Sequence, residues 1–247
     1  GSAQASFEGT AHYEEDTFYW QNMPDEDPND GLKPDRWFWG NTLIQRLPSG
    51  SGQSQDEYST IVDFDIANHL SGDPVSLTVH LQPRTTDESN TLEHHVLIYL
   101  NQEVPQNLVA DRTWIGLNSY TFTVTLTQAQ GLADGPTSWT NSLKIINDSD
   151  NFLSEFYLDW FEVRYLDTLR TDDGRVLSFR GNGDAGDQTS RNFLLRNFNE
   201  RPDVYDITDY PNEVWRVPVD PTVQGYQFRD QSDREYFAAG ISGKLLP

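Results

Sequence analysis

Period-two alternation of apolar and polar residues constrains this chain more than any other feature of its sequence. In residues 75–82, Val75, Leu77, Val79 and Leu81 alternate with Ser, Thr, His and Gln. Side chains of a strand point alternately to opposite faces, so such a run predicts a half-buried strand. Further candidate strands are 58–66, 92–100, 119–127, 142–146 and 155–166. With no long helical pattern and only a short turn over 127–133, we expect an all-β chain built on a β-sandwich.

A boundary between two domains is expected near 167–173, where the last long strand ends and Asp172-Asp173-Gly174 forms a turn sequence. Shorter β segments follow at 175–180, 191–198, 203–208 with 213–219, and 225–237. We therefore predict a jelly-roll β-sandwich over 6–167, a small all-β domain over 168–241, and a linker over 242–247. Residues 21–35 are expected to form a long acidic loop, and residues 48–56 a loop rich in Gly, Ser and Gln.

Composition excludes several classes of function. The 247 residues carry 39 acidic and 17 basic side chains, a net charge of −22, so phosphate backbones would be repelled and nucleic-acid binding is not expected. Without cysteine there is no disulfide, thiolate zinc site or cysteine nucleophile. No stretch is long and apolar enough for a membrane helix. The acidic excess itself has three readings, namely solubility, a salt-tolerant or marine source, and cation binding.

The start of the chain indicates export. Ala3-Gln4-Ala5 resembles the small-x-small residues near a signal-peptide cleavage site. We expect a secreted or cell-surface protein.

A set of motifs in a fixed order resembles one known family. The motifs are Arg36-Trp37-Phe38-Trp39, His94-His95-Val96 with Leu100-Asn101, Trp114-Ile115-Gly116, Asn141-Ser142-Leu143-Lys144-Ile145, Tyr157-Leu158-Asp159-Trp160-Phe161-Glu162-Val163, Phe193-Leu194-Leu195-Arg196-Asn197-Phe198 and Val204-Tyr205-Asp206-Ile207-Thr208-Asp209. Their order is similar to the β-sandwich and connector that precede the catalytic domain in gingipain-like cysteine peptidases of bacteria with type IX secretion. One departure is Asn101-Gln102, which replaces the family's Asn-Gly turn, with an insertion at 103–112 that predicts a longer hairpin.

The resemblance implies an accessory role. The family's catalytic Cys and His belong to a domain that would start after Pro247, and this chain has no Cys. The chain is therefore expected to be a non-catalytic, surface-associated region, with a following peptidase domain in the same polypeptide as its partner.

The last-strand motif also resembles galactose-binding-type jelly rolls, which include many carbohydrate-binding modules. That resemblance implies a structural Ca²⁺ between an acidic first strand and an Asp in the last strand. Ca²⁺ takes six to eight oxygen ligands. Glu14, Glu15 and Asp16 lie on the predicted first strand and Asp159 in the last, so these four are the candidate ligands. The runs 147–151 and 184–187 are second choices, and neither has the spacing of an EF-hand loop.

Aromatic side chains at strand ends or in loops are candidates for a sugar-binding platform. An exposed ring stacks on the C–H face of a pyranose. Trp37, Trp39, Trp114 and Tyr120 are the candidates, and Trp37 and Trp39 would share one strand face with Phe38 on the other. Tyr19 and Trp20 flank the acidic loop. The alternative is that these rings pack in the core.

Two further groups of polar residues are not expected to form a metal or catalytic site. His94 and His95 are adjacent in a strand and point to opposite faces, so they do not chelate one metal, and one of them is expected to be buried with a hydrogen-bond partner. Asp63 and Asp65 share a face and would suit a glycosidase only if they faced a cleft. No nucleophile elbow, zinc-protease motif or phosphate loop is present.

The leading hypothesis is a non-catalytic binding region, specific for a glycan or cell-surface polysaccharide and stabilised by Ca²⁺. A purely structural spacer that packs against a peptidase domain is the alternative, and a polysaccharide-active enzyme is the third.

Overall fold

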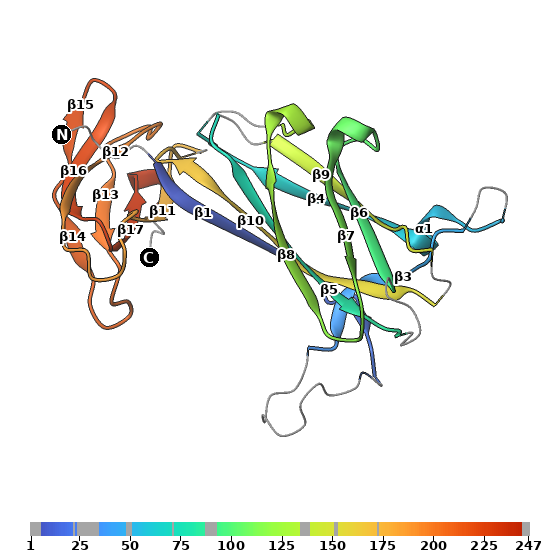
Figure 1. Cartoon of the computed structure of the whole chain (residues 1–247). Helices are drawn as coiled ribbons and strands as arrows, with labels where there is room; N and C mark the ends of the chain where they lie inside the picture. Colours follow the sequence, from blue (N-terminus) through green and yellow to red (C-terminus); the bar gives the residue numbers. More distant parts are fainter. Residues whose placement is uncertain are drawn as a thin grey trace.

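The computed structural model describes residues 6–21, 23, 35–47, 51–70, 72–86, 93–133, 139–150, 153–171 and 173–243. Within these ranges the chain is nearly all β, in several antiparallel sheets (Figure 1). The prediction of an all-β fold with a sandwich is confirmed. No helix in the described part of the chain is both long and apolar enough to cross a bilayer.

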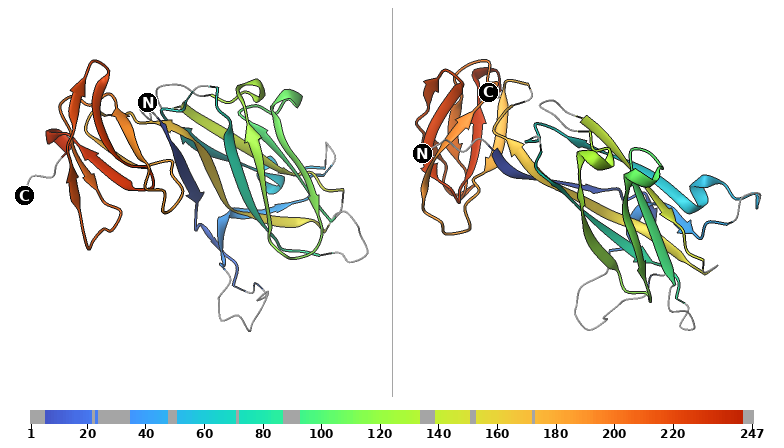
Figure 2. Two further views of the ribbon diagram at one scale, coloured as in Figure 1. Left: turned by 60° about the vertical axis from the view of Figure 1, so that its left-hand side comes forward. Right: turned by 45° about the horizontal axis from the view of Figure 1, so that its top comes forward.

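The first part of the chain is a sandwich of two sheets. Its strands are β1 (Ser6–Glu14), β2 (Phe18–Tyr19), β3 (Trp37–Ile44), β4 (Ser59–Ile66), β5 (Val75–Pro83), β6 (His94–Leu100), β7 (Leu108–Trp114), β8 (Tyr120–Leu126), β9 (Trp139–Asn147) and β10 (Glu155–Thr168). One sheet has the order β2-β3-β10-β5-β8 with β1 also on β10, and the other has the order β4-β9-β6-β7. The chain crosses between the sheets at most connections, the connectivity of a jelly roll (Figure 2).

The long strand β10 organises the first sheet. On one side it pairs with β5, and on the other side it changes partner along its length. β1 pairs with residues Trp160 to Thr168, whereas β3 pairs with Glu155 to Leu158. Asp159 lies between these two stretches, at a β-bulge where the register with β5 also shifts. A bulge re-aims a side chain and interrupts the ladder.

The sandwich core lies between the two sheets. Its residues come from alternate positions of the strands, as the period-two pattern predicted, and Phe161, Leu158 and Val163 of β10 lie at its centre with almost no exposed surface. A smaller cluster covers the opposite face of the first sheet, where Phe38 and Tyr157 stack at a centroid distance of 4.8 Å. The sheet is therefore partly covered on both faces.

The second part of the chain forms two smaller sheets, seen in orange and red in Figure 1. Its strands are β11 (Val176–Arg180), β12 (Ser190–Leu195), β13 (Asp203–Asp206), β14 (Trp215–Val217), β15 (Asp220–Thr222), β16 (Gly225–Gln231) and β17 (Glu235–Ala239). The sheet orders are β11-β17-β13-β14 and β12-β16-β15. Phe193, Phe228 and Tyr236 fill the core between them.

The two hydrophobic cores divide along the chain near residue 168. Phe7 is the exception, since it begins the sandwich strand β1 but packs on Phe179 in the second core at 5.8 Å. β1 and β10 thus run side by side into the second unit (Figure 1). The division into a domain over 6–167 and one over 168–241 stays a prediction.

Short helices complete the described chain: α1 (Gln55–Tyr58), η1 (Pro105–Asn107), η2 (Gln128–Gln130) and η3 (Ile241–Gly243). η2 falls on the expected turn at 127–133. Most of the predicted acidic loop, residues 48–50 of the second loop, and residues 244–247 of the predicted linker lie outside the described residues.

Candidate functional site: an acidic cluster beside an exposed aromatic pair

Acidic side chains from three segments of the chain come together at the bulge at Asp159. β1 ends at Glu14, opposite Trp160, and Asp35 immediately precedes the residues that lead into β3. One carboxylate oxygen from each of Glu14, Asp35 and Asp159 lies within 4.8 Å of the other two. All three donors are oxygen atoms, which hard cations such as Ca²⁺ prefer.

Asp159 is the buried member of this cluster. The residue is only 6% exposed, and its Oδ1 is buried without a hydrogen-bond partner among the described residues. Burial, together with the negative charges of Asp35, Glu14 and Asp16, raises the pKa of Asp159 to about 7. A buried carboxylate with an unsatisfied oxygen is costly unless a proton or a cation compensates it.

Histidine side chains adjoin two of the carboxylates. His80 Nε2 lies 3.5 Å from Asp159 Oδ2, and its Nδ1 is 2.6 Å from Thr121 Oγ1. His12 Nε2 lies 3.1 Å from Glu14 Oε2. Both imidazoles contact Trp160: His80 stacks on it with ring centroids at 5.0 Å, and His12 lies tilted by 37° with centroids at 5.3 Å. These contacts restrain the carboxylates of Asp159 and Glu14 on the outer face of the first sheet.

The predicted ligand set is partly brought together. Glu14 and Asp159 belong to the cluster, and Asp16 is close enough to perturb the Asp159 pKa. Glu15 is exposed and lies outside the group. Asp35 was not among the predicted ligands. Its position at the end of the acidic loop, two residues before Trp37, could have indicated it. Whether any of these residues holds a metal stays a prediction.

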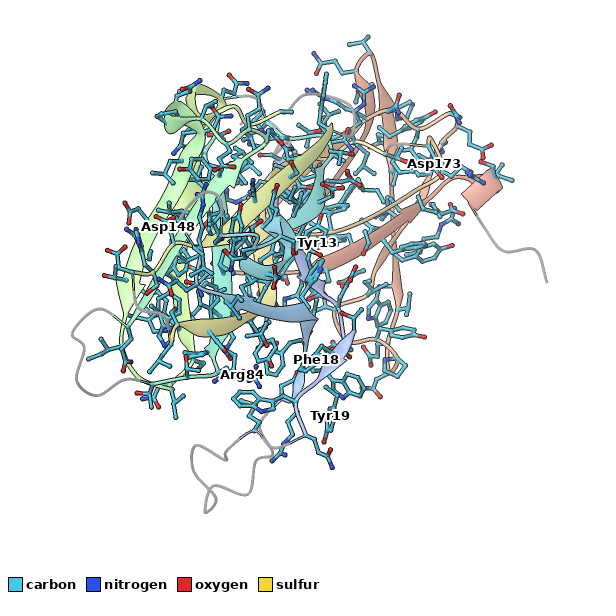
Figure 3. The ribbon with its side chains drawn as sticks, turned by 90° about the vertical axis from the view of Figure 1, so that its right-hand side faces the viewer. Tyr13, Phe18, Tyr19, Arg84, Asp148 and Asp173 are labelled. Carbon is cyan, nitrogen blue, oxygen red and sulfur yellow. The ribbon has the colours of Figure 1, made fainter. Side chains whose placement is uncertain are left out.

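An exposed aromatic pair lies next to this cluster. Tyr19 of β2 and Trp37 of β3 are opposite each other in the ladder, with ring centroids at 4.9 Å and planes tilted by 50°. They are 47% and 44% exposed, so both rings present surface to solvent. The Trp37 backbone N–H donates a hydrogen bond to Asp35 Oδ1 at 2.9 Å. Figure 3 shows Tyr19 beside Phe18 at one edge of the sandwich.

The other predicted platform residues lie in or against the core. Trp114 is 8% exposed and stacks between Tyr120 and His94, with centroids at 4.9 Å from each. Trp39 is partly buried against Phe161 at 5.6 Å. Of the four candidates, only Trp37 is about half exposed, and Tyr19 beside it is exposed to a similar extent.

The histidine pair behaves as predicted. His94 is buried, with Nδ1 3.1 Å from Ser154 Oγ and Nε2 3.2 Å from the Thr85 carbonyl oxygen. His95 points to the other face, where Nε2 lies 2.8 Å from Asp111 Oδ1. Their roles in this geometry are structural.

The remaining acidic candidates serve the fold or face solvent. Asp63 and Asp65 are both exposed on the outer face of β4, where Asp65 accepts a hydrogen bond from Thr140 Oγ1 at 2.7 Å. In the run 147–151, Asn147 is buried and donates to the Leu43 carbonyl at 2.9 Å. In the run 184–187, Asp187 binds the Thr189 N–H and Ser232 Oγ.

Charge is unevenly divided between the two parts of the chain. Residues 1–167 hold 26 of the 39 acidic and 7 of the 17 basic side chains, a net charge of −19, which leaves −3 for residues 168–247. The sandwich therefore carries almost all of the net negative charge of the chain.

Comparison with known proteins gives a fold likeness. No family model matches the chain, and no curated protein sequence matches it. The crystal structure of dimeric latent PorU from Porphyromonas gingivalis matches with a TM-score of 0.62 and 13% identity. The match covers 100% of this chain and 22% of the PorU chain, so this chain spans about a fifth of that protein. A family 35 carbohydrate-binding module from Clostridium thermocellum aligns over 50% of this chain and 88% of its own, with 14% identity and a TM-score of 0.25, too slight a likeness to bear on the fold.

Proposed function

We propose that this chain is the non-catalytic binding region of an exported surface protein, in which the sandwich holds a structural Ca²⁺ and binds a glycan weakly and reversibly. The observation that carries the proposal is the buried, unsatisfied Asp159 carboxylate beside the exposed Tyr19–Trp37 pair. The fold likeness to PorU supports the setting that the sequence resemblance implies, an accessory region followed by a peptidase domain.

Ca²⁺ is the cation that best suits the cluster. Glu14, Asp35 and Asp159 supply carboxylate oxygens, and Asp16, whose charge acts on Asp159, together with water would complete the six to eight ligands that Ca²⁺ takes. A divalent charge offsets the repulsion that raises the Asp159 pKa and satisfies its free oxygen. The ligands come from the first strand, the segment just before β3 and the last strand of the sandwich, so the ion would crosslink segments far apart in the sequence.

A neutral glycan is the ligand that best suits the aromatic pair. The two half-exposed rings at 4.9 Å present faces for the C–H groups of successive sugars. With a net charge of −19 on residues 1–167, the sandwich repels polyuronates and sulfated polysaccharides. The proposed mechanism is recognition alone, by stacking and a few polar contacts.

Addition of CaCl₂ is expected to raise the melting temperature, and EDTA to reverse the rise. A ligand that binds only the native state at about 100 times its Kd stabilises by about 2.7 kcal/mol. Asp159→Asn removes the central ligand charge and is expected to abolish the shift, whereas Glu15→Gln, outside the cluster, keeps it. Differential scanning fluorimetry measures both, and an undiminished shift in Asp159→Asn would contradict the proposed site.

Trp37→Ala is expected to weaken glycan binding about tenfold, which corresponds to about 1.4 kcal/mol and lies within the range for one aromatic stack. The measurement is calorimetric titration with cellohexaose, xylohexaose and mannohexaose, with polygalacturonate as the anionic comparison. Trp139 is the matched control, because it is 46% exposed, as open as Trp37, but lies on the other sheet. Equal losses in Trp37→Ala and Trp139→Ala would argue against the platform.

A structural spacer is the second candidate, favoured by a separate observation. In the second unit Tyr210, Val214 and Trp215 are 73%, 48% and 62% exposed, on a part of the chain with a net charge of only −3. Exposed aromatic and aliphatic side chains of this kind suit protein contacts. If none of the sugars binds, this role becomes the leading one.

A further inference from the structure

The acidic cluster and the aromatic pair share one residue, Asp35. Its carboxylate meets those of Glu14 and Asp159, and its Oδ1 also accepts the hydrogen bond from the Trp37 backbone N–H at 2.9 Å. Trp37 in turn pairs with Tyr19. The residue that brings negative charge to the cluster therefore also positions the backbone of the platform.

β2 and its flanking residues, rather than β10, hold this end of β3. The Trp20 N–H donates a hydrogen bond to the Arg36 carbonyl oxygen at 2.8 Å, and the Thr17 N–H donates one to the Phe38 carbonyl oxygen at 3.2 Å. The ladder of β3 with β10 runs from Ile44 to Trp39 and stops there, so among the described residues the ladder partner of Trp37 is Tyr19 of the two-residue strand β2. Both rings are about half exposed, so packing in the sandwich core does not fix their positions. The position of the platform thus depends on local contacts, of which the Asp35 hydrogen bond is one.

Without a cation, repulsion within the cluster acts mainly on Asp35. Asp159 is buried in β10, and Glu14 ends a strand that is paired with β10 from Ser6 to Glu14. Asp35 is exposed and precedes its strand. Since the charges lie within 4.8 Å of one another, moving Asp35 outward relieves the repulsion at the least structural cost, and Trp37 moves with it.

We propose that a cation bound by Glu14, Asp35 and Asp159 orders the Tyr19–Trp37 pair, so that the cation-loaded protein binds a neutral glycan more tightly than the cation-free protein. The inference rests on the proposed function and adds regulation to it. An ordered platform loses less conformational freedom when the sugar binds. Because coupling between two ligands is reciprocal, the glycan raises the cation affinity by the same factor.

Calorimetric titration of the three neutral hexaoses in CaCl₂ and in EDTA tests the coupling. For the wild type we expect a Kd at least about fivefold lower in CaCl₂, the lower end of measured couplings between sites. Asp35→Asn keeps an oxygen that accepts the Trp37 N–H but removes the charge, and its Kd is expected to be the same in both solutions. Glu15→Gln, an adjacent acid outside the cluster, is expected to keep the wild-type ratio.

A second readout separates this inference from the proposed function. Hydroxyl-radical footprinting without sugar is expected to show a change in the oxidation rates of Tyr19 and Trp37 when CaCl₂ is added, and no such change for Trp139. If CaCl₂ stabilises the protein and a hexaose binds with equal Kd in both solutions, the coupling is overturned and the proposed function stands. If no hexaose binds, the glycan proposal fails, and unchanged footprints at Tyr19 and Trp37 would then overturn the ordering as well.

Discussion

In EDTA at pH 8, Asp159→Asn is expected to raise the free energy of unfolding by about 4 kcal/mol. The wild type holds a charged carboxylate that is 6% exposed, has an oxygen without a partner and lies beside Asp35, Glu14 and Asp16. Its pKa moves from 3.8 to about 7 on folding. Each unit of such a shift corresponds to about 1.4 kcal/mol, and an amide of the same shape carries no charge to bury.

The sign of the pH dependence follows from this raised pKa. Between pH 3.8 and about 7 the folded protein holds a proton on Asp159 that the unfolded chain has released, so stability falls as pH rises through this window. Above about pH 7 the loss is complete. Asp173, Asp187 and Asp206 have lowered pKa values and contribute in the opposite direction, but they are common to both proteins and cancel in the difference.

Urea denaturation of both proteins at pH 4 and pH 8 measures this difference. The two are expected to be equally stable at pH 4, and the variant to be more stable at pH 8 in EDTA. CaCl₂ is expected to stabilise only the wild type. It should therefore narrow or reverse the difference in the free energy of unfolding between the two proteins at pH 8. A variant less stable than the wild type in EDTA at pH 8 would mean that the Asp159 carboxylate is favourably paired without a cation.

A site residue could be predicted from sequence only where the order of the strands, rather than a tertiary irregularity, determines its position. Glu14 and Asp159 could be paired from sequence because first and last strands of such sandwiches are commonly neighbours, and β1 does lie along β10. Asp35 could not, because its place depends on the bulge at Asp159 and on the change of partner from β1 to β3. These are tertiary features with no periodic signal.

The fold shows the same division. Alternation located β5, β6, β8 and β10 to within a few residues because each buries one face against the sandwich core along most of its length. Alternation did not predict β7 as a strand, because Asp111, Arg112 and Thr113 are all exposed and interrupt the pattern. The segment was expected only as part of a longer hairpin. Trp114 was therefore placed near a loop, whereas pairing with His94 puts it in the core. The segment 225–237 proved to be two strands, β16 and β17, joined by a short turn.

The alternation of Trp37, Phe38 and Trp39 was correct, but it could not say which Trp would be open. Phe38 packs with Tyr157 in the smaller hydrophobic cluster, and Trp39 packs on Phe161 in the sandwich core, so the two side chains lie on opposite faces of the strand. Trp37 shares the face of Trp39 and yet is exposed, because it lies beyond the point where β3 leaves β10. Exposure of a strand residue thus depends on where the ladder ends, which period-two patterning does not record.

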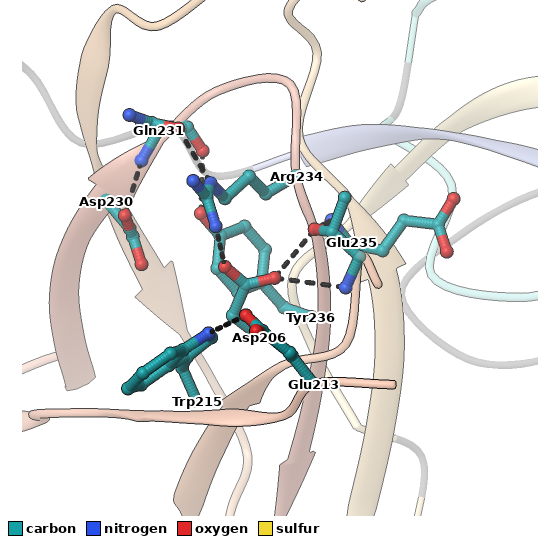
Figure 4. A network of polar contacts seen from close by, with 9 residues as sticks. Asp206, Glu213, Trp215, Asp230, Gln231, Arg234, Glu235 and Tyr236 are labelled. Carbon is teal, nitrogen blue, oxygen red and sulfur yellow. Dashed lines mark hydrogen bonds and ion pairs between the residues drawn. The ribbon is translucent and has the colours of Figure 1, made fainter. Parts of the chain in front are cut away.

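Asp206→Ala is expected to lower the free energy of unfolding of the second unit by about 3 kcal/mol, the loss typical of removing one partner from a buried ion pair. Figure 4 shows the network: Asp206 pairs with Arg234, and its Oδ1 accepts hydrogen bonds from Thr208 N at 3.0 Å and Thr208 Oγ1 at 2.6 Å. The Asp206 side chain is only 4% exposed. Its removal leaves Arg234 Nη1 and two Thr208 donors without this acceptor, while Arg234 Nε keeps its hydrogen bond to Gln231 Oε1.

A nearby exposed pair provides the control for this prediction. Glu235 and Arg180 are 3.9 Å apart with side chains about half exposed, so Glu235→Ala is expected to change stability by less than about 1 kcal/mol. Burial raises the Asp206 pKa, but the hydrogen bonds from Thr208 and Arg234 outweigh it and hold the pKa below 3.8. The stabilisation is therefore complete above pH 3.8 and is lost as pH falls through the lower folded pKa, so the deficit of Asp206→Ala should shrink in acid. Urea denaturation followed by circular dichroism measures it, and equal effects of the two substitutions at neutral pH would show that burial of the Asp206 pair adds nothing to the stability of this unit.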